Sequence, residues 1–204
     1  MPPADAPRAH PVLVLLNGPP GCGKSTLATR YAADHPLTLA LDIDRVRAML
    51  GDWRRHPTEA GLAARELALV AARTHLRAGH DVVVPQLLAR PDFLVRLERL
   101  AAEVGAPFVE IVLLDTREAA RRRFVDRTAR AETRDHVEAA AALDAAGGLD
   151  ELDAMYDRLV AMLADRPAAH RVPSVEGDVD GTYAAVLAVV RDAVAEAARR
   201  DRLT

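Results

Sequence analysis

The stretch LLNGPPGCGKSTLATRYA, residues 15–32, limits what this chain can fold into more than any other feature. It passes from an apolar strand, through a turn with three glycines, two prolines and a lysine, into an amphipathic helix. The turn satisfies the pattern G-x-x-x-x-G-K-[ST] from Gly18 to Ser25. Glycines let successive backbone N–H groups point inward, and the positive end of the following helix adds to the attraction for anions. The stretch therefore predicts a loop that holds a polyphosphate.

Each part of this loop has an expected role in holding a nucleoside triphosphate and Mg²⁺. Lys24 can reach the β- and γ-phosphates as a mobile positive charge, Ser25 can bind Mg²⁺, and Thr26 can contact the α-phosphate. The residues expected to surround the phosphates are Gly18, Pro19, Pro20, Gly21, Cys22, Gly23, Lys24, Ser25 and Thr26. A chance match is disfavoured, because strand, turn, lysine, hydroxyl and helix occur in the required order. Kinases, ATPases and GTPases share this loop, so it predicts a bound nucleotide without fixing the reaction.

Apolar runs alternate with amphipathic segments along the rest of the chain. Strands are expected at residues 12–16, 37–44, 81–86, 107–115 and 170–177. Helices are expected at residues 24–33, 44–51, 59–79, 133–146, 149–164 and 180–200, and also from about 91 and from about 117. This alternation is typical of a parallel sheet covered on both faces.

The sequence therefore predicts a single α/β domain over residues 1–204, a P-loop NTPase fold with a five-stranded parallel sheet and helices on both faces. Residues 1–10 are expected to form a flexible N-terminus, and residues from about 123 to 148 a helical lid.

Composition and charge narrow the classes of partner. Half of the 204 residues are hydrophobic and 28% are charged, which is the balance of a soluble globular protein. The formal charge of −3 makes nucleic acid an unlikely partner, because nonspecific binding to it depends on a broad basic surface. The single cysteine, Cys22, excludes an internal disulfide and a multi-cysteine zinc site. Residues 1–10 lack the apolar core of a signal peptide and no apolar run approaches the roughly 18 residues of a membrane span, so a cytoplasmic protein without a membrane partner is expected.

A second group of polar residues occurs in LDIDRVR, at residues 41–47. Alternation along a strand would place Asp42 and Asp44 on one face near its carboxyl end, where open parallel sheets bind ligands. A carboxylate there can accept the proton of an attacking hydroxyl, and Arg47, one helical turn after Asp44, can hold the acceptor. The alternative is that Asp44 only caps a helix beginning at Arg45, with Asp42 and Arg47 as solvated charges.

GPPGCGKST followed about twenty residues later by LDIDRVR resembles the small P-loop kinases. That group includes adenylylsulfate kinase, the 5′-hydroxyl kinase domain of polynucleotide kinase, gluconate kinase, chloramphenicol phosphotransferase and the zeta-toxin kinases, and it overlaps with AAA-type ATP-binding proteins. The resemblance covers residues from about 12 to 134. It implies Mg-ATP as the phosphoryl donor, Asp44 as the base that activates the acceptor, and Asp42 and Arg47 as further acceptor-site residues.

Arginines at helical spacing follow the predicted fourth strand, in REAARRRFVDRTARAETR. Arg123, Arg127, Arg130 and Arg134 fall on one helical face. In the kinases that the chain resembles, such arginines belong to a lid that closes over ATP, and the resemblance applies best to Arg123 and Arg127. Arg127 is the one expected to take part in catalysis; the alternative is a solvated charged face. The resemblance also places the adenine beside the turn around Gly177.

The chain departs from its relatives at the end of the third strand. Many of them have an aspartate there that organises Mg²⁺, whereas DVVVPQ offers Pro85 and Gln86. Gln86 can position a water or an acceptor hydroxyl without contributing charge, or it can be a buried polar residue with no chemical role. Metal organisation would then depend on Ser25, Asp42 and water.

The leading hypothesis is an ATP-dependent phosphotransferase that moves the γ-phosphoryl group to a hydroxyl of a nucleoside, sugar or antibiotic. A polynucleotide 5′-hydroxyl kinase would share these motifs, but the acidic charge balance disfavours it. A P-loop ATPase that sequesters a ligand or signals to a partner is the alternative that the missing aspartate favours. The sequence itself does not indicate an oligomeric state.

Overall fold

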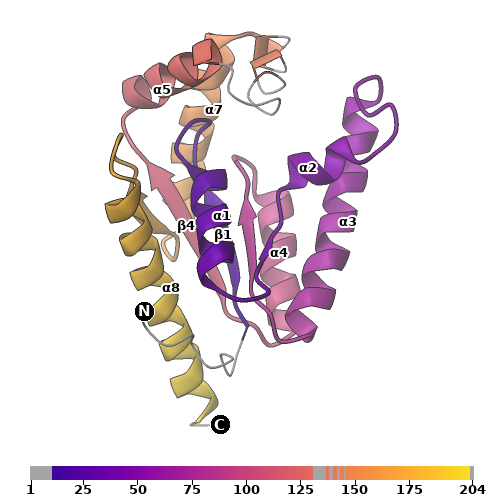
Figure 1. Ribbon diagram of the computed structural model, residues 1–204, viewed down its shortest axis with the longest axis vertical. Coiled ribbons are helices and arrows are strands. Elements are labelled where there is room, and N and C mark those ends of the chain that lie inside the picture. The colour runs from indigo at the N-terminus through magenta and orange to yellow at the C-terminus, as the bar shows by residue number, and fades with distance from the viewer. Residues whose placement is uncertain (1–10, 131–136, 138–139, 142, 145, 203–204) are drawn as a thin grey trace.

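A five-stranded parallel sheet forms the centre of the protein (Figure 1). The computed structural model describes residues 11–130, 137, 140–141, 143–144 and 146–202. The strands follow one another across the sheet in the order β2-β3-β1-β4-β5, and every neighbouring pair is parallel. They are β1 (Leu13–Asn17), β2 (Leu39–Ala40), β3 (Val82–Pro85), β4 (Phe108–Leu114) and β5 (His170–Pro173). Strand β1 is buried throughout, as its apolar sequence predicts.

Helices cover both faces of the sheet, because side chains alternate between the two faces along each strand. On one face, Val14 and Leu16 of β1 join a core formed with α1 and α8. On the other, Leu13 and Leu15 join a core formed with α3 and α4, and α7 covers Val112 of β4 on that same side. These helices are α1 (Lys24–Asp34), α3 (Pro57–Arg77), α4 (Pro91–Glu103), α7 (Leu149–Met162) and α8 (Val179–Asp201), and a 3₁₀ turn at Leu163–Asp165 follows α7. No described helix is long and apolar enough to cross a lipid bilayer.

The ends of the long helices follow local sequence signals. Pro57 and Pro91 open α3 and α4 at positions where the missing N–H costs no hydrogen bond. Gly79 and Gly105 lie just beyond the same two helices in the left-handed conformation that glycine favours. The expected helix at residues 133–146 falls largely outside the described residues.

The prediction of a strand over residues 37–44 is wrong for most of that segment. Strand β2 contains only Leu39 and Ala40, and the Leu41 N–H makes the last bond to β3, with the Val83 carbonyl. The Asp42 carboxylate then accepts hydrogen bonds from the N–H groups of Asp44 and Arg45, at 2.9 and 3.4 Å. Helix α2 (Ile43–Ala48) therefore begins directly after Asp42, because a capped helix satisfies these N–H groups where the sheet ends.

The carboxyl edge of the sheet carries the elements that matter for function. The loop after β1 leads into α1, α2 follows β2, and α5 (Arg117–Arg130) follows β4. Figure 1 shows α2 and α5 at this end of the molecule, on opposite sides of the loop after β1. From β1 the chain continues to β2 and β3 on one side of it, and then crosses to β4 and β5 on the other side. The strand β1 therefore borders the point in the sheet where the direction of the strand order reverses. Ligands of open α/β sheets bind at that point.

Candidate active site

The loop from Gly18 to Gly23 has the backbone geometry that its sequence predicts. Gly18, Gly21 and Gly23 have φ angles of +144°, +85° and +87°, which residues with a side chain rarely adopt. A Cβ atom on Gly18 would lie 2.5 Å from the Leu113 carbonyl oxygen and 2.7 Å from the Cys22 sulfur. Glycine is therefore required at residue 18, where the loop passes directly over β4.

A buried asparagine fixes the start of this P-loop. The Oδ1 atom of Asn17 accepts hydrogen bonds from the N–H groups of Gly18 and Leu88, at 2.8 and 2.9 Å. Its Nδ2 atom donates to the Leu88 carbonyl at 3.0 Å, and the side chain is fully buried. The P-loop and the segment after β3 are thus joined through one side chain, which the sequence analysis did not identify.

Lys24 reaches back across the P-loop from the first residue of α1. Its Nζ atom donates to the carbonyl oxygens of Gly18 and Pro19, each at 2.8 Å, and lies 3.8 Å from the Cys22 sulfur. Ser25 and Thr26 are exposed in the first turn of α1. The ammonium group therefore lies over the loop, and two hydroxyls lie exposed beside it.

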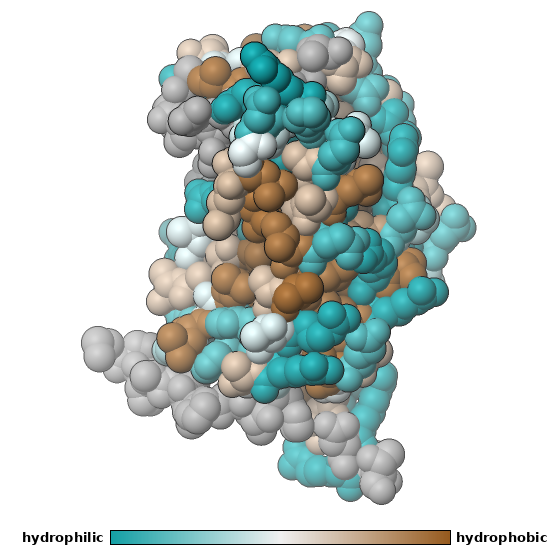
Figure 2. All heavy atoms as spheres, turned by 90° about the vertical axis from the view of Figure 1, so that its right-hand side faces the viewer, coloured by the Kyte–Doolittle hydropathy of each residue, from teal (hydrophilic) through white to brown (hydrophobic). Residues whose placement is uncertain are grey.

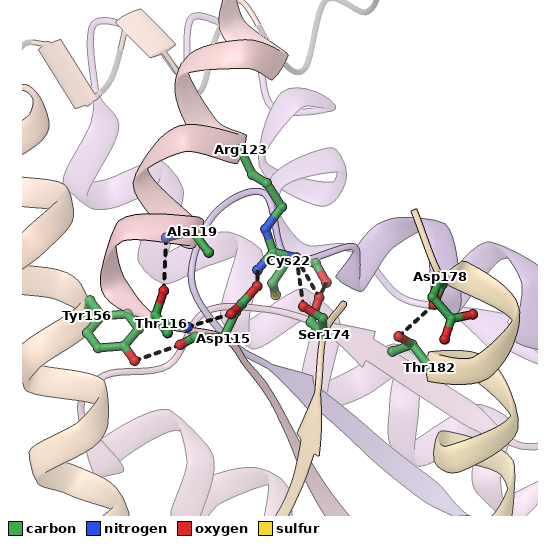
Figure 3. A network of polar contacts seen from close by, with 9 residues as sticks. All are labelled: Cys22, Asp115, Thr116, Ala119, Arg123, Tyr156, Ser174, Asp178 and Thr182. Atoms are coloured by element: carbon green, nitrogen blue, oxygen red, sulfur yellow. Dashed lines mark hydrogen bonds and ion pairs between the residues drawn. The ribbon is translucent and has the colours of Figure 1, made fainter. Parts of the chain in front are cut away.

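Arg123 of α5 is held by the residues that directly follow β4 and β5 (Figure 3). Its guanidinium donates to the Asp115 carboxylate at 2.7 Å, and to the carbonyl and hydroxyl oxygens of Ser174 at 3.0 and 2.9 Å. The Ser174 hydroxyl in turn donates to the Cys22 carbonyl of the P-loop at 3.0 Å. The Arg123 side chain is only 9% exposed. Arg123 thus connects the ends of β4 and β5 with the P-loop through its two terminal nitrogens, while its Nε is buried without a hydrogen-bond partner among the described residues.

The same network extends toward α7. Figure 3 shows the Tyr156 hydroxyl pointing at the Asp115 carbonyl, to which it donates at 2.7 Å. Thr116 accepts a hydrogen bond from the Ala119 N–H and so caps the start of α5. Helices α5 and α7 are thereby fixed to the end of β4, next to the P-loop.

A pocket lies between the P-loop and the turn that joins β5 to α8; we refer to it as the β5 pocket. Gly177, which the resemblance places beside the adenine, is part of its wall. The residues that line it are Gly21, Cys22, Gly23, Thr26, Leu27, Arg123, Ser174, Val175, Glu176, Gly177, Val179 and Thr182. The pocket opens directly beside the P-loop, because Gly21, Cys22 and Gly23 line it.

Arg127 lies one helical turn beyond Arg123 and has a different environment. Its guanidinium lies 5.3 Å from the centre of the Phe124 ring, and its Nε is buried without a hydrogen-bond partner among the described residues. Burial lowers the pKa of Arg127 below its ordinary value. An arginine stays charged at physiological pH all the same. Arg127 therefore presents an incompletely hydrogen-bonded cation beside the P-loop.

Helix α2 holds the predicted acceptor-site residues in a changed arrangement. Asp44 and Arg47 form an ion pair of 3.1 Å across one helical turn, and the Asp44 side chain is 60% exposed. The Arg47 guanidinium also lies 4.8 Å from the centre of the Trp53 ring. Asp42, expected on the same strand face as Asp44, is instead the helix cap. The alternative in which Asp44 caps a helix beginning at Arg45 is therefore also wrong, because the helix already begins at Ile43.

Gln86 directly follows β3, and its N–H donates to the Leu16 carbonyl at 3.1 Å. Its side-chain Oε1 is buried and has no hydrogen-bond partner among the described residues. A buried amide oxygen without a partner is costly, so this atom is suited to accept a hydrogen bond from a hydroxyl or a water.

The structure also adds residues that sequence reasoning missed. Asn17, Asp115 and Ser174 each follow or end a strand at the carboxyl edge of the sheet. A polar residue at the end of a buried apolar run was the available signal for Asn17 and Asp115, whereas Ser174 follows a largely exposed strand and had no such signal. Their partners lie elsewhere in the chain, so only the folded structure reveals which groups they hold.

The profile of a protein family described as an AAA domain matches residues 13–152, more than half of the chain. The chain belongs to this family. The match begins at β1 and includes the P-loop, α2 and α5 of this AAA domain protein. No curated protein sequence matches it significantly.

Solved structures of similar fold include several kinases. A Chloroflexus aurantiacus protein described provisionally as a kinase has a TM-score of 0.63 and 17% identity, over 92% of this chain and 97% of that one. Kti12 from Chaetomium thermophilum, solved with ADP-AlF3, has a TM-score of 0.57 and 16% identity, over 89% and 98%. A gluconokinase from Sinorhizobium meliloti 1021 has a TM-score of 0.51 and 16% identity, over 94% of each chain. The AAA domain protein therefore has the fold of P-loop kinases, as the sequence resemblance implied.

Proposed function

We propose that this AAA domain protein is an ATP-dependent kinase that transfers the γ-phosphoryl group of Mg-ATP to a hydroxyl of a small molecule, such as a nucleoside, a sugar or an antibiotic. The observation that carries the proposal is the order of three features along the carboxyl edge of the sheet. The β5 pocket lies at one side, the P-loop follows β1 at the centre, and the Asp44–Arg47 pair follows β2 at the other side. A nucleotide with its base in the pocket and its phosphates in the loop would direct its γ-phosphate toward the side of α2.

The residues of the site supply a role for each step of the transfer. Lys24 would exchange its two carbonyl partners for oxygens of the β- and γ-phosphates. Asp44 would take the proton of the acceptor hydroxyl as its oxygen attacks the γ-phosphorus and the bond to the β–γ bridging oxygen breaks, leaving ADP. Arg47 would hold the acceptor, and Arg127 would neutralise charge on the transferred group.

Mg²⁺ fits the site as an ion shared with the nucleotide. It is usually held through one or two protein groups, phosphate oxygens and water, and when bound it neutralises charge on the phosphates. The exposed hydroxyl of Ser25 beside the loop suits that arrangement. Among the described residues no group of three or more His, Cys, Asp or Glu side chains could hold a metal by itself. The capping role of Asp42 makes Ser25 the better protein ligand.

A second candidate is a nucleotide-binding protein that hydrolyses ATP or sequesters a ligand without transferring phosphate to it. Gln86 favours this candidate, because it stands where an acidic residue would help to organise Mg²⁺ in many of the kinases that the chain resembles. The two candidates differ in whether an acceptor changes the rate at which ATP is consumed.

The test is ATP consumption measured alone and with a panel of nucleosides, sugars, antibiotics and 5′-hydroxyl oligonucleotides. We expect one class of hydroxyl compound to accelerate consumption and to become phosphorylated in equal amount. Asp44→Asn should abolish this transfer while leaving the affinity for ATP within a few-fold of the wild type. A matched control is Asp52→Asn, which breaks the Asp52–Arg55 pair at the same i,i+3 spacing outside α2 and should leave the rate unchanged. ATP hydrolysis that no acceptor alters would favour the second candidate.

A further inference from the structure

Exposed apolar side chains are concentrated on one side of the molecule. The described residues include ten large hydrophobic side chains that are exposed. Five of them lie on α3 or on segments that contact it: Leu37, Met49, Leu62, Leu67 and Val70. The Leu37 carbonyl accepts a hydrogen bond from His75 of α3, and Met49 directly follows α2, which packs on α3. Figure 2 looks at the side on which α3 lies in Figure 1 and shows apolar residues down the middle of that face, bordered by polar ones. Such clustering on one face distinguishes an interaction surface from scattered exposed residues.

A narrower stripe runs along the outer side of α3. Ala63, Leu67, Val70 and Thr74 are all exposed and follow the spacing i, i+4, i+7, i+11. At 3.6 residues per turn these four positions fall within an arc of about 60°. This spacing is that of a helix that packs along its length against another helix.

The charges that flank the stripe are arranged for pairing with a second copy of the same helix. Glu59 and Arg77 are exposed, and neither forms an ion pair within the described part of the chain. They are separated by 18 residues, which is five turns, so they lie on the same edge of the stripe. The next charges outward, Glu66 and Arg73, already pair with Arg96 and Glu103 of α4.

We propose that this stripe is a homodimer interface, in which α3 packs antiparallel against α3 of a second copy around a two-fold axis near residue 68. Glu59 and Arg77 each lie about 13.5 Å along the helix from that level, on opposite sides of it. The two-fold axis therefore sets Glu59 of one copy beside Arg77 of the other, twice, and brings Leu67 next to Val70 of the second copy. An interface of this kind is self-complementary in both shape and charge, as a two-fold contact requires.

Sedimentation velocity of the full chain, from about 1 to about 100 μM, tests the proposal over the range in which weak pairs dissociate. The wild type is expected to approach twice the monomer mass of 22.0 kDa as the concentration rises. Val70→Asp should restore the monomer mass, whereas Val160→Asp, which places the same charge at an exposed valine of α7, should leave the dimer intact. Circular dichroism of each variant confirms that it is folded.

Charge exchange provides the second arm of the experiment and does not disturb the apolar stripe. Glu59→Arg or Arg77→Glu alone puts like charges opposite one another and should weaken the dimer at least tenfold. Mixing the two single variants should restore a heterodimer, because each introduced charge then faces an opposite charge. A wild type that stays monomeric over the whole range, a dimer that survives Val70→Asp, or a mixture that remains monomeric would each overturn the proposal.

Discussion

Substituting alanine for Gly18 should disrupt the P-loop through a close approach that the structure makes explicit. The new Cβ would lie 2.5 Å from the backbone carbonyl oxygen of Leu113, a fully buried residue near the carboxyl end of β4. Forcing an extra carbon into a packed site costs about 1–3 kcal/mol. A side chain at a glycine-only backbone conformation, here a φ of +144°, costs roughly another 1–3 kcal/mol. Gly18→Ala should therefore lower the free energy of unfolding by roughly 2–6 kcal/mol.

Two other glycines separate these contributions. A Cβ on Gly23 would meet no atom within 4 Å, but its φ of +87° is left-handed, so Gly23→Ala should cost only the backbone strain of about 1–2 kcal/mol. Gly61 lies inside α3 with open space around it and no positive φ. Gly61→Ala should therefore stabilise the protein by about 0.5–1 kcal/mol, because alanine loses less backbone entropy in a helix.

The assay is urea denaturation of the three variants beside the wild type, with the affinity for an ATP analogue measured by calorimetry. With a denaturant slope of about 2 kcal/mol/M, Gly18→Ala should shift the unfolding midpoint down by roughly 1–3 M and weaken the binding of the analogue. The reasoning would be refuted if Gly18→Ala kept both the wild-type midpoint and the wild-type affinity. It would also fail if Gly23→Ala destabilised the protein as much as Gly18→Ala does.

Three further predictions concern other contacts. Arg123→Lys keeps the charge but cannot hold Asp115 and Ser174 together. The variant should lower the free energy of unfolding by about 1–3 kcal/mol and raise KM for ATP more than it lowers kcat, and an unchanged KM would contradict this. Asp42→Ala removes the cap of α2 and should lower the free energy of unfolding by about 1 kcal/mol, whereas Asp42→Asn should cost much less; equal losses in urea would exclude the capping role. Burial raises the pKa of Glu110 above its ordinary value of 4.5, despite a 2.7 Å hydrogen bond from Arg166. The folded protein therefore holds that proton more tightly than the unfolded chain does, and its free energy of unfolding falls as the pH rises above 4.5. The side chain of Glu110→Gln cannot ionise. In urea titrations at several pH values, the free energy of unfolding of this variant relative to the wild type should therefore increase as the pH rises above 4.5. A difference between the two proteins that does not change with pH would contradict the assignment.

Local sequence signals were sufficient where one feature dominated the energetics. The run from Leu13 to Asn17 could only be a buried strand, and the glycines after it could only serve a loop of unusual backbone angles, so β1 and the P-loop were predictable. The segment around Asp42 was different, because alternating apolar residues favour a strand while an aspartate before a helical run favours a cap. The sheet gives residues 39–44 few bonds to β3, and the helix cap prevails from Asp42 onward.

Periodicity also failed to separate the two arginines of α5. It placed Arg123 and Arg127 on one helical face and suggested one role for both. Their environments differ because the partners of Arg123 come from the ends of two strands, Asp115 eight residues away and Ser174 fifty-one residues away. The Nε atoms of both arginines are buried without a hydrogen-bond partner among the described residues, but only Arg123 bonds these residues through its terminal nitrogens. Contacts between distant segments decide such roles, and a single sequence does not encode them in any local pattern.

The fate of the γ-phosphoryl group tests the proposed kinase activity most directly. Phosphorus NMR of a reaction that contains Mg-ATP and an accelerating acceptor distinguishes a phosphate monoester of that acceptor from inorganic phosphate. A monoester resonance that grows as fast as the γ-phosphate signal of ATP declines, and that is missing with Asp44→Asn, is the predicted result. Inorganic phosphate as the sole product, with every acceptor present, would contradict it.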